Sequence, residues 1–213
     1  MAHLYPIYLR LAGKRCLVVG GGQVAERKTA TLLEYEANVR LVSPEVTTCL
    51  DNWAAQNLIA WRRGEFQPED LEEILLVFIA TGDSKVNKHV TALCREKGIL
   101  VNAVDDPPNC DFYVPSILRR NSLCLAISTE GKSPLLAAKL RRELEDQITD
   151  VYGEWVEILG SLRDEIKTSN LDLDEKRRLF EALVYSDMLD LLKEGKKEQI
   201  EERIKECMSS LRE

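Results

Sequence analysis

A glycine-rich stretch near the N-terminus has the residue types that hold a phosphate. Residues 16–28 read CLVVGGGQVAERK, in which Gly20, Gly22 and Ala25 fit the G-x-G-x-x-G/A pattern of dinucleotide-binding turns. The first glycine allows a tight turn, the second admits a pyrophosphate, and the small third residue lets a helix pack on a strand. A strand-like run precedes the pattern and a helical pattern follows it. This context favours a dinucleotide site over a glycine turn without a ligand.

A second stretch, VNAVDDPP at residues 101–108, places two carboxylates at the end of an apolar run. Pro107 and Pro108 lack a backbone N–H and fix φ, so the chain must turn after Asp105 and Asp106. A carboxylate held beside a nicotinamide ring could act as a general base, accepting a proton as hydride leaves. The alternative is a polar turn with proline stops and no catalytic role.

Apolar, β-rich runs alternate with helical patterns through the first half of the chain. The expected strands are 16–20, 38–43, 58–63, 75–81 and 99–104, and the expected helices are 24–36, 47–57, 68–74 and 84–98. Strands that are apolar on both faces and alternate with helices predict a parallel sheet, covered on both sides. We therefore expect an α/β fold with a Rossmann-type doubly wound sheet. Ligands of such sheets lie beyond the carboxyl ends of the strands, where both stretches above fall.

The pattern changes after Pro108. Two extended segments around Asn121 predict a hairpin within 112–129, and Ser133 and Pro134 predict the capped start of a helix. Residues 150–213 have no strand signal and predict three helices, broken near Asn170 and Gly195. We expect a dinucleotide-binding domain at 1–111, a small α+β dimerisation segment at 112–149 and a helical domain at 150–213. Since the sheet cannot cover the hairpin and the apolar face of the following helix, a two-fold homodimer is expected through this segment.

Charge is unevenly distributed along the chain. The net charge of −7 divides into −1 for residues 1–105, +3 for 106–142 and −9 for 143–213. Without a broad basic face, the chain is not expected to bind nucleic acid. The basic residues of the middle segment suit an anionic substrate, because arginine binds carboxylates in a bidentate manner. The plainer alternative is a solvated helix face. These basic residues are Arg119, Arg120, Lys132, Lys139, Arg141 and Arg142.

Cysteine, histidine and apolar patterning favour a cytoplasmic protein without a resident metal. The six cysteines have no C-x-x-C spacing and several lie in apolar runs, which predicts reduced, buried thiols. The longest apolar run, 74–80, is too short for a membrane span, and the N-terminus lacks the pattern of a signal peptide. His3 and His89 are the only histidines, so a histidine-rich metal site is not expected.

Four stretches together resemble one known family. GGGQVAERK, IATGDSKVN, VNAVDDPPNCDFYVPSILRR and STEGKSPLLAAKLRRELE are similar to the corresponding segments of precorrin-2 dehydrogenase, the NAD-dependent enzyme of siroheme synthesis. In some organisms this enzyme is the N-terminal portion of a larger siroheme synthase. The resemblance covers about residues 1–150 strongly and the helical tail more loosely. No methyltransferase domain is expected within these 213 residues.

The resemblance implies oxidation of precorrin-2 to sirohydrochlorin by a homodimer, with NAD⁺ as hydride acceptor. It implies that Asp105, rather than Asp106, is the catalytic aspartate and that Ser133 binds substrate. Its dinucleotide contacts fall on Gln23–Val24 and Pro44–Glu45. With the strand-end positions added, the expected cofactor-binding residues are Gly20, Gly22, Gln23, Val24, Ser43, Pro44, Glu45 and Thr81. The expected substrate-binding residues are Asn102, Arg119, Arg120, Lys132, Ser133 and Arg141.

Several alternatives remain beside this interpretation. No acidic residue ends the second strand to bind the ribose, so Ser43 or Glu45 would have to bind it. No arginine follows Ser43 closely to bind the 2′-phosphate of NADP, which favours NAD as the cofactor. A short-chain dehydrogenase would need a tyrosine with a lysine four residues later, and none is present. A redox-sensing NAD-binding regulator would normally carry a DNA-binding element, against which the acidic tail argues. Whether the enzyme also inserts iron into sirohydrochlorin is left open.

Overall fold

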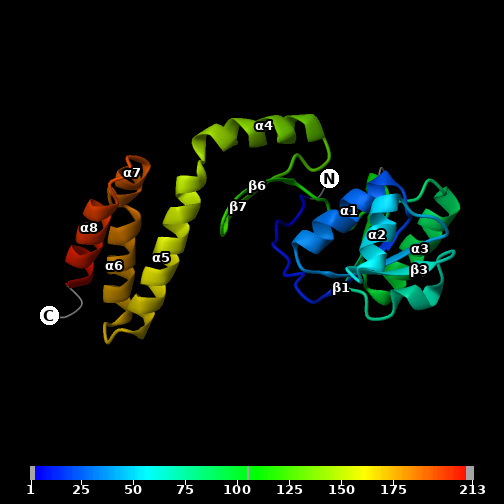
Figure 1. The fold of residues 1–213 in the computed structure, drawn as a ribbon, viewed down its shortest axis with the longest axis horizontal. Coiled ribbons are helices and arrows are strands. Elements are labelled where there is room, and N and C mark those ends of the chain that lie inside the picture. Colours follow the sequence, from blue (N-terminus) through cyan, green and yellow to red (C-terminus); the bar gives the residue numbers. More distant parts are fainter. Residues whose placement is uncertain (1–2, 105, 210–213) are drawn as a thin grey trace. The chain divides into compact units, whose positions relative to one another are not determined.

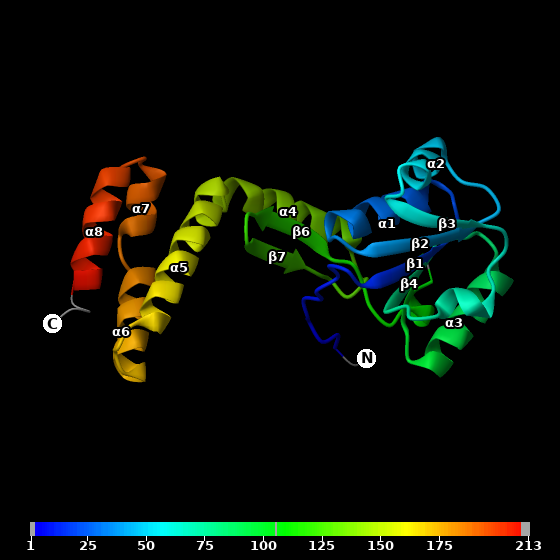
Figure 2. The same ribbon diagram turned by 60° about the horizontal axis from the view of Figure 1, so that its bottom comes forward.

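The computed structural model describes residues 3–104 and 106–209. The chain divides after Val114 into two compact units (Figures 1 and 2). The first unit contains the parallel sheet, and the second contains a hairpin and five helices among the described residues.

The first unit is built on a five-stranded, fully parallel sheet. Its strand order is β3-β2-β1-β4-β5, the order of the first five strands of a Rossmann sheet. The predicted α/β fold class is therefore confirmed. The strands are β1 (Arg15–Val19), β2 (Asn38–Ser43), β3 (Ile59–Arg63), β4 (Leu76–Ile79) and β5 (Leu100–Ala103).

Three helices connect these strands, α1 (Gln23–Glu34), α2 (Thr48–Ala55) and α3 (Ser84–Lys97). The helix predicted at 68–74 is a shorter 3-10 turn, η1 (Pro68–Leu71), because Glu72 is extended and Glu73 has a positive φ of 58°. Gly98 ends α3 as predicted, since its φ of 67° is the left-handed conformation that glycine adopts without strain. A second 3-10 turn, η2 (Pro107–Asn109), follows β5.

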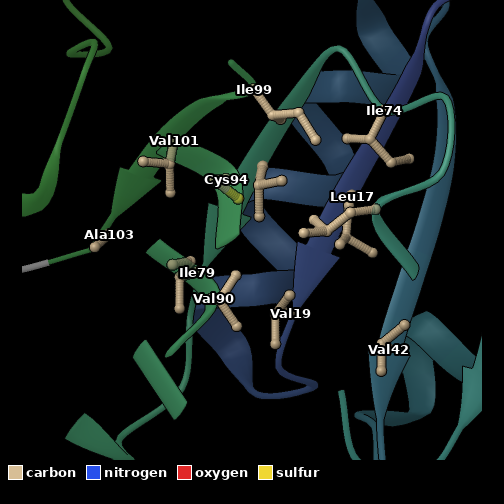
Figure 3. Close-up of a cluster of buried hydrophobic side chains, with 12 residues drawn as sticks. Leu17, Val19, Val42, Ile74, Ile79, Val90, Cys94, Ile99, Val101 and Ala103 are labelled. Carbon is tan, nitrogen blue, oxygen red and sulfur yellow. The ribbon is translucent and has the colours of Figure 1, made fainter. Parts of the chain in front are cut away.

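Both faces of the sheet are buried, which explains why its strands are apolar throughout. On central strand β1, Leu17 and Val19 belong to the cluster on the α3 face, whereas Cys16 and Val18 belong to the cluster under α1 and α2. Figure 3 shows Leu17 facing Cys94 and its neighbours on the α3 face. Burial raises the pKa of the Cys16 and Cys94 thiols to about 11, so both behave as small apolar groups.

The second unit begins with the predicted antiparallel hairpin, β6 (Ser116–Arg120) and β7 (Leu123–Ile127). Helix α4 (Pro134–Gln147) packs on the hairpin and starts as predicted, because the Ser133 hydroxyl accepts a hydrogen bond from the Leu136 N–H. The remaining helices are α5 (Asp150–Thr168), α6 (Leu173–Val184), α7 (Met188–Lys193) and α8 (Lys197–Ser209).

The expectation of three helices after residue 150 is wrong, because the described residues of this segment, 150–209, form four. The additional break falls at Ser186, between α6 and α7. Its hydroxyl donates to the Leu183 carbonyl and accepts from the Met188 N–H, at 2.8 and 3.3 Å. A serine that satisfies backbone groups in this way competes with the helix and ends it. The four helices share a core around Trp155, Leu162 and Leu183.

Helix α5 also packs closely on the hairpin. A β-carbon at Gly153 would lie 2.8 Å from the backbone carbonyl of Arg120, so only glycine fits where α5 meets β6. Among the described residues, no helix combines the length and the apolar character needed to cross a bilayer.

Candidate dinucleotide-binding site

A cavity of about 1000 Å³ opens at the carboxyl ends of the parallel strands. It is lined by the turns that follow β1, β2, β3 and β4 and by one side of α3. The rule for open α/β sheets places a ligand at this edge. The residues lining the cavity are Val19, Gly20, Gly21, Gly22, Val42, Ser43, Pro44, Glu45, Val46, Thr47, Gly64, Glu65, Phe66, Ala80, Thr81, Gly82, Asp83, Val86 and His89.

The three consecutive glycines of the β1–α1 turn have different roles. Gly20 has a φ of 118°, and a β-carbon there would collide with the carbonyl of Ala80 at the end of β4. A β-carbon at Gly21 would collide with the carbonyl of Glu45. Gly22 has an extended backbone, with φ −83° and ψ −173°, and a β-carbon there would meet nothing within 4 Å. The first two glycines are therefore required by the fold, and Gly22 is the one that leaves space on the cavity side.

That space fits a pyrophosphate. Gly22 is the N-cap of α1 and makes no side-chain cap, and Gln23 and Val24 are the first residues of the helix. The first N–H groups of an α-helix have no acceptor within the helix and, with the helix dipole, attract anions. Ala25 is fully buried against the sheet, as the third position of the fingerprint requires. The cradle thus has the shape and the donors for the phosphates of a dinucleotide.

The tip of β2 closes against the glycine turn. The Ser43 hydroxyl donates to the Glu45 carbonyl at 2.6 Å, and the Thr47 N–H donates to the Gly21 carbonyl at 3.0 Å. Because the Ser43 hydroxyl proton is used in this bond to Glu45, the hydroxyl can serve a ligand only as a hydrogen-bond acceptor. Glu45 exposes its side chain beside the cavity and can accept from ribose hydroxyl groups.

Arg63 is a residue that the sequence analysis missed. The parallel pairing of β2 with β3 places Arg63 opposite Ser43, and its Nε donates to the Pro44 carbonyl at 3.2 Å. A cation therefore lies at the tip of β2, although Arg63 is far from Ser43 in the sequence. The signal that could have identified it is the register between two neighbouring strands, rather than the distance along the chain.

The tip of β4 is also tied by its own side chains. The Thr81 hydroxyl donates to the Asn87 side-chain oxygen at 2.7 Å, and the Asn87 amide donates to the Thr81 carbonyl at 3.2 Å. Asp83 caps α3 through its Oδ1, which accepts from the Lys85 and Val86 N–H groups. Thr81 thus lines the cavity with a fixed orientation.

The loop after β5 begins at the same edge of the sheet. Asp105, the expected general base, lies outside the described residues. Around it, the Val101 N–H donates to Asp111 Oδ2 at 3.0 Å, and the Asp111 N–H donates to the Val101 carbonyl at 2.8 Å. Asn102, expected to bind substrate, is buried and donates its amide to the Phe112 carbonyl at 2.8 Å. These contacts fix both ends of the loop.

The carboxylate of Asp106 is used by the turn that follows it. Its Oδ2 accepts from the Asn109 side-chain amide at 2.8 Å, at the start of η2. The Cys110 thiol donates to the Ala103 carbonyl at 3.1 Å, and burial raises its pKa. Asp106 therefore has a structural role in this loop, independent of any proton transfer.

The basic residues expected to bind substrate all lie in the second unit, and their surroundings differ. The Arg120 guanidinium donates to the carbonyls of Ile148 and Glu145, at 3.0 and 3.3 Å, and thereby ties the end of α4 to β6. Arg141 is paired with Glu145 on α4. Arg119 is exposed and its guanidinium contacts the Cys124 sulfur. Lys132 is exposed in the turn before α4, and Ser133 caps that helix. Within the described ranges, no group of three or more histidine, cysteine or acidic residues could hold a metal ion.

Residues 7–116 match a family model described as "Putative NAD(P)-binding". The chain belongs to this family. Its cofactor is accordingly a nicotinamide dinucleotide, as the glycine turn predicted, and the sequence-based expectation of NAD agrees with it. Two further models match later segments of the chain, sirohaem biosynthesis protein central at residues 120–147 and sirohaem synthase dimerisation region at 151–208. The segment named for dimerisation thus lies C-terminal to the one from which we expected the dimer.

Curated relatives carry the same combination of segments. The chain is 39% identical over 185 residues to siroheme synthase 2 of Yersinia enterocolitica, covering 87% of this chain and 39% of that protein. It is 41% identical over 184 residues to siroheme synthase 3 of Aeromonas hydrophila, covering 86% of this chain and 39% of that protein. The chain therefore spans about two fifths of the length of these relatives.

Among solved structures, the chain is similar to one titled SirC, precorrin-2 dehydrogenase. The two share 28% sequence identity with a TM-score of 0.76, over 93% of this chain and 100% of that chain. The expected resemblance to the precorrin-2 dehydrogenase and siroheme synthase proteins is confirmed by these matches.

Proposed function

We propose that this protein oxidises precorrin-2 to sirohydrochlorin with NAD⁺. The observation that carries the proposal is the dinucleotide cavity at the strand ends, with the loop of the two aspartates following β5 at the same edge. The similarity to a precorrin-2 dehydrogenase over 93% of this chain, together with the siroheme synthase relatives, supports the choice of substrate. The balanced reaction converts precorrin-2 and NAD⁺ to sirohydrochlorin, NADH and a proton.

In this reaction the chain binds the cofactor, accepts a proton and holds the loop that carries the proton acceptor. Bound NAD⁺ supplies the hydride acceptor. The N-terminus of α1 binds the phosphates and the open side of Gly22 admits them. Asp105 accepts the proton that must leave the substrate as hydride departs, because a positioned carboxylate is a competent general base. The contacts of Asn102 and Asp111 hold the ends of the loop that carries it.

Precorrin-2 is a polyanion, so cations should bind its carboxylates. Arg119 and Lys132 are the strongest candidates among the expected residues, because both side chains are exposed. Arg120 and Arg141 already bind groups of the second unit and are weaker candidates. Ser133 keeps its proposed contact, because capping α4 uses the hydroxyl as an acceptor and leaves its proton available.

We further propose that the enzyme acts as a cytoplasmic homodimer. The match to a sirohaem synthase dimerisation region supports self-association. Apolar side chains of α4 that stay exposed within the second unit, Leu135 at 85% and Leu136 at 46%, are suitable contacts for a second copy. Sedimentation at micromolar concentration should give a dimer, and a monomer would contradict this part of the proposal.

The deciding experiment mixes purified protein, precorrin-2 and NAD⁺ without oxygen and follows NADH and sirohydrochlorin by absorbance. Both products should form in equal amounts. A protein that binds NAD⁺ in calorimetry but produces neither would be a sensor rather than an enzyme. Adding Fe²⁺ after the oxidation, with a protein-free sample for comparison, would reveal a second activity as an iron chelatase.

A further inference from the structure

The wall of the cavity that comes from the β3–η1 connection has no regular structure of its own. This connection, the 64–67 loop, contributes Gly64, Glu65 and Phe66 to the cavity lining. Phe66 packs edge-on against His89 of α3, with ring centroids 6.1 Å apart, and Val86 lines the cavity beside them. The position of this wall therefore depends on what fixes the loop.

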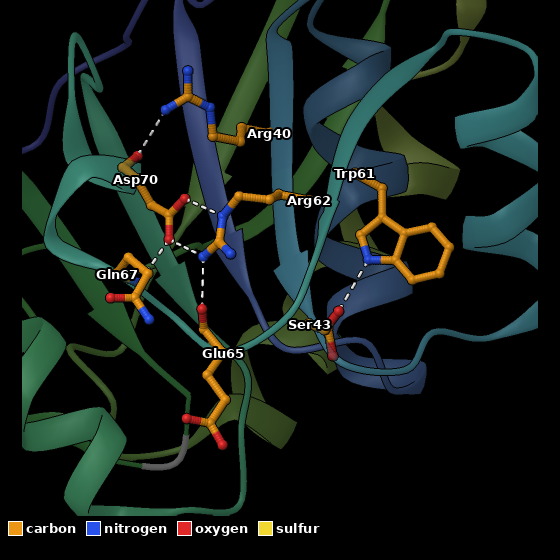
Figure 4. Close-up of polar contacts among 7 residues, drawn as sticks. All are labelled: Arg40, Ser43, Trp61, Arg62, Glu65, Gln67 and Asp70. Carbon is orange, nitrogen blue, oxygen red and sulfur yellow. Dashed lines mark hydrogen bonds and ion pairs between the residues drawn. The ribbon is translucent and has the colours of Figure 1, made fainter.

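One ion pair fixes it. Asp70 is 4% exposed and receives the Arg62 guanidinium with both carboxylate oxygens, the Nε–Oδ1 distance being 2.6 Å. The same guanidinium donates to the Glu65 carbonyl at 2.6 Å, and the Gln67 N–H donates to Asp70 Oδ2 at 2.7 Å. Figure 4 shows these contacts converging on the Arg62–Asp70 pair.

Neighbouring strands anchor the pair and the loop in turn. Arg40 of β2 donates to the Asp70 carbonyl at 3.1 Å, and the Gly64 N–H donates to the Ser43 carbonyl at 3.2 Å. Two charged side chains thus hold backbone groups at two positions of the loop. The carboxylate of this bidentate pair is buried, whereas the Arg62 side chain is 40% exposed. The pair's directed hydrogen bonds to the Glu65 carbonyl and the Gln67 N–H favour one geometry of the loop.

We propose that Arg62 and Asp70 are positioning residues for the cofactor, which hold the 64–67 loop as a preformed wall of the dinucleotide cavity. Neither side chain lines the cavity, so their effect passes through Gly64, Glu65 and Phe66. The inference rests on the proposed function only in requiring that a dinucleotide occupies this cavity. A preformed wall avoids the entropy cost of ordering a loop upon binding, so the benefit appears as affinity for NAD⁺.

The first variant is Asp70→Asn, which keeps the shape but removes the charge and one acceptor. The dissociation constant for NAD⁺ measured by calorimetry should rise about five- to tenfold, which corresponds to the net contribution of roughly one hydrogen bond. The KM for NAD⁺ should rise in parallel, whereas kcat at saturating NAD⁺ should stay near that of the wild type. Glu72→Gln is the matched control, because it removes an exposed carboxylate at the end of the same 3-10 turn.

The second variant separates positioning from stability. Arg62→Met with Asp70→Leu replaces the pair by apolar side chains, so that no unpaired charge is left at the buried position 70. It cannot hold the Glu65 carbonyl or the Gln67 N–H. We expect a melting temperature near that of the wild type together with persistently weak NAD⁺ binding.

Two results would overturn the inference. One is wild-type NAD⁺ affinity in a folded Asp70→Asn protein; the other is recovery of NAD⁺ affinity in the double variant, which would make the pair a stabilising contact only. If the wild type itself bound no NAD⁺, the assignment of the cavity would fail instead, so the two failures can be told apart.

Discussion

The first unit, called here the sheet unit, and the second unit, called the helical unit, use their charged side chains differently. In the sheet unit, Arg62 pairs with the buried carboxylate of Asp70 and fixes loop backbone beside a cavity whose lining is mostly glycine and apolar residues. In the helical unit, Arg120 donates to the Ile148 carbonyl at the end of α4. Other charged side chains there form exposed ion pairs along the helices, such as Arg177 with Glu181. The comparison teaches that an arginine's partners, more than its presence, decide whether it can bind a ligand.

The largest effect is expected at the loop after β5, where the sheet unit should supply its one reacting group. Asp105→Ala should lower turnover by about 10²–10⁴-fold, the usual cost of removing a general base, and should leave NAD⁺ binding intact. Stopped-flow rates of NADH formation with parallel calorimetry measure both quantities.

Asp106→Ala is the matched variant, because its carboxylate serves the η2 turn. It should stay within a few-fold of wild-type turnover. A dead Asp106→Ala beside an active Asp105→Ala would reverse the roles of the two residues. If both variants were active, the carboxylates would belong only to the turn.

The next largest effect tests the glycine turn. Gly22→Val should abolish measurable NAD⁺ binding and leave the melting temperature nearly unchanged, because Gly22 has ordinary φ and ψ and open space at its β-carbon. Gly160→Val, also unhindered but on α5, is the control and should bind NAD⁺ normally. Undiminished calorimetric affinity in Gly22→Val would remove the phosphate site from this turn.

A third prediction contrasts two cations of the helical unit. Arg120→Ala should lower the free energy of unfolding by about 1.5–3 kcal/mol, since its guanidinium binds backbone carbonyls in a partly buried position. Lys132→Ala should leave stability unchanged and raise the KM for precorrin-2. Chemical denaturation and steady-state kinetics on both variants measure the difference. If the Arg120→Ala protein were as stable as the wild type but had a raised KM for precorrin-2, Arg120 would have to be assigned to substrate binding.

A smaller effect is expected for cofactor choice. Arg63 lies at the β2 tip with Nε bound to the Pro44 carbonyl, which leaves the end of its guanidinium for a 2′-phosphate. Arg63→Ala should therefore weaken NADP⁺ binding several-fold more than NAD⁺ binding, as competitive titrations can measure. Equal loss for both cofactors would show that Arg63 only supports the loop.

The smallest effect concerns two thiols of the sheet core. Since burial raises the pKa of Cys16 and Cys94 to about 11, only about one thiol in a thousand is ionised at pH 8. Neither should react with iodoacetamide in the native protein, whereas both should react after denaturation. Mass spectrometry of peptides from the two samples distinguishes the cases, and rapid native labelling would mean that the sheet core opens readily.

Local patterns were enough to predict the sheet, the glycine turn and the cap at Ser133, because each depends on residues close together in sequence. Arg63 escaped prediction because its place beside Pro44 depends on how β2 and β3 are paired. The contact of Asp70 with Arg62 was missed for a similar reason, since it joins a strand to a later turn. The break at Ser186 was missed because serine is also common inside helices, and only its two backbone contacts reveal the end.

The order of the strands has a consequence for how the protein is made. Central strand β1 pairs with β4 through partners such as Cys16 and Leu76, 60 positions apart in the sequence. Closing so long a loop costs entropy before any contact rewards it, so this pairing should form late. While the chain is being synthesised, the glycine turn exists long before the β4 tip that completes the cavity. A chain interrupted before Leu76 would therefore contain the whole fingerprint and still have no place for a dinucleotide.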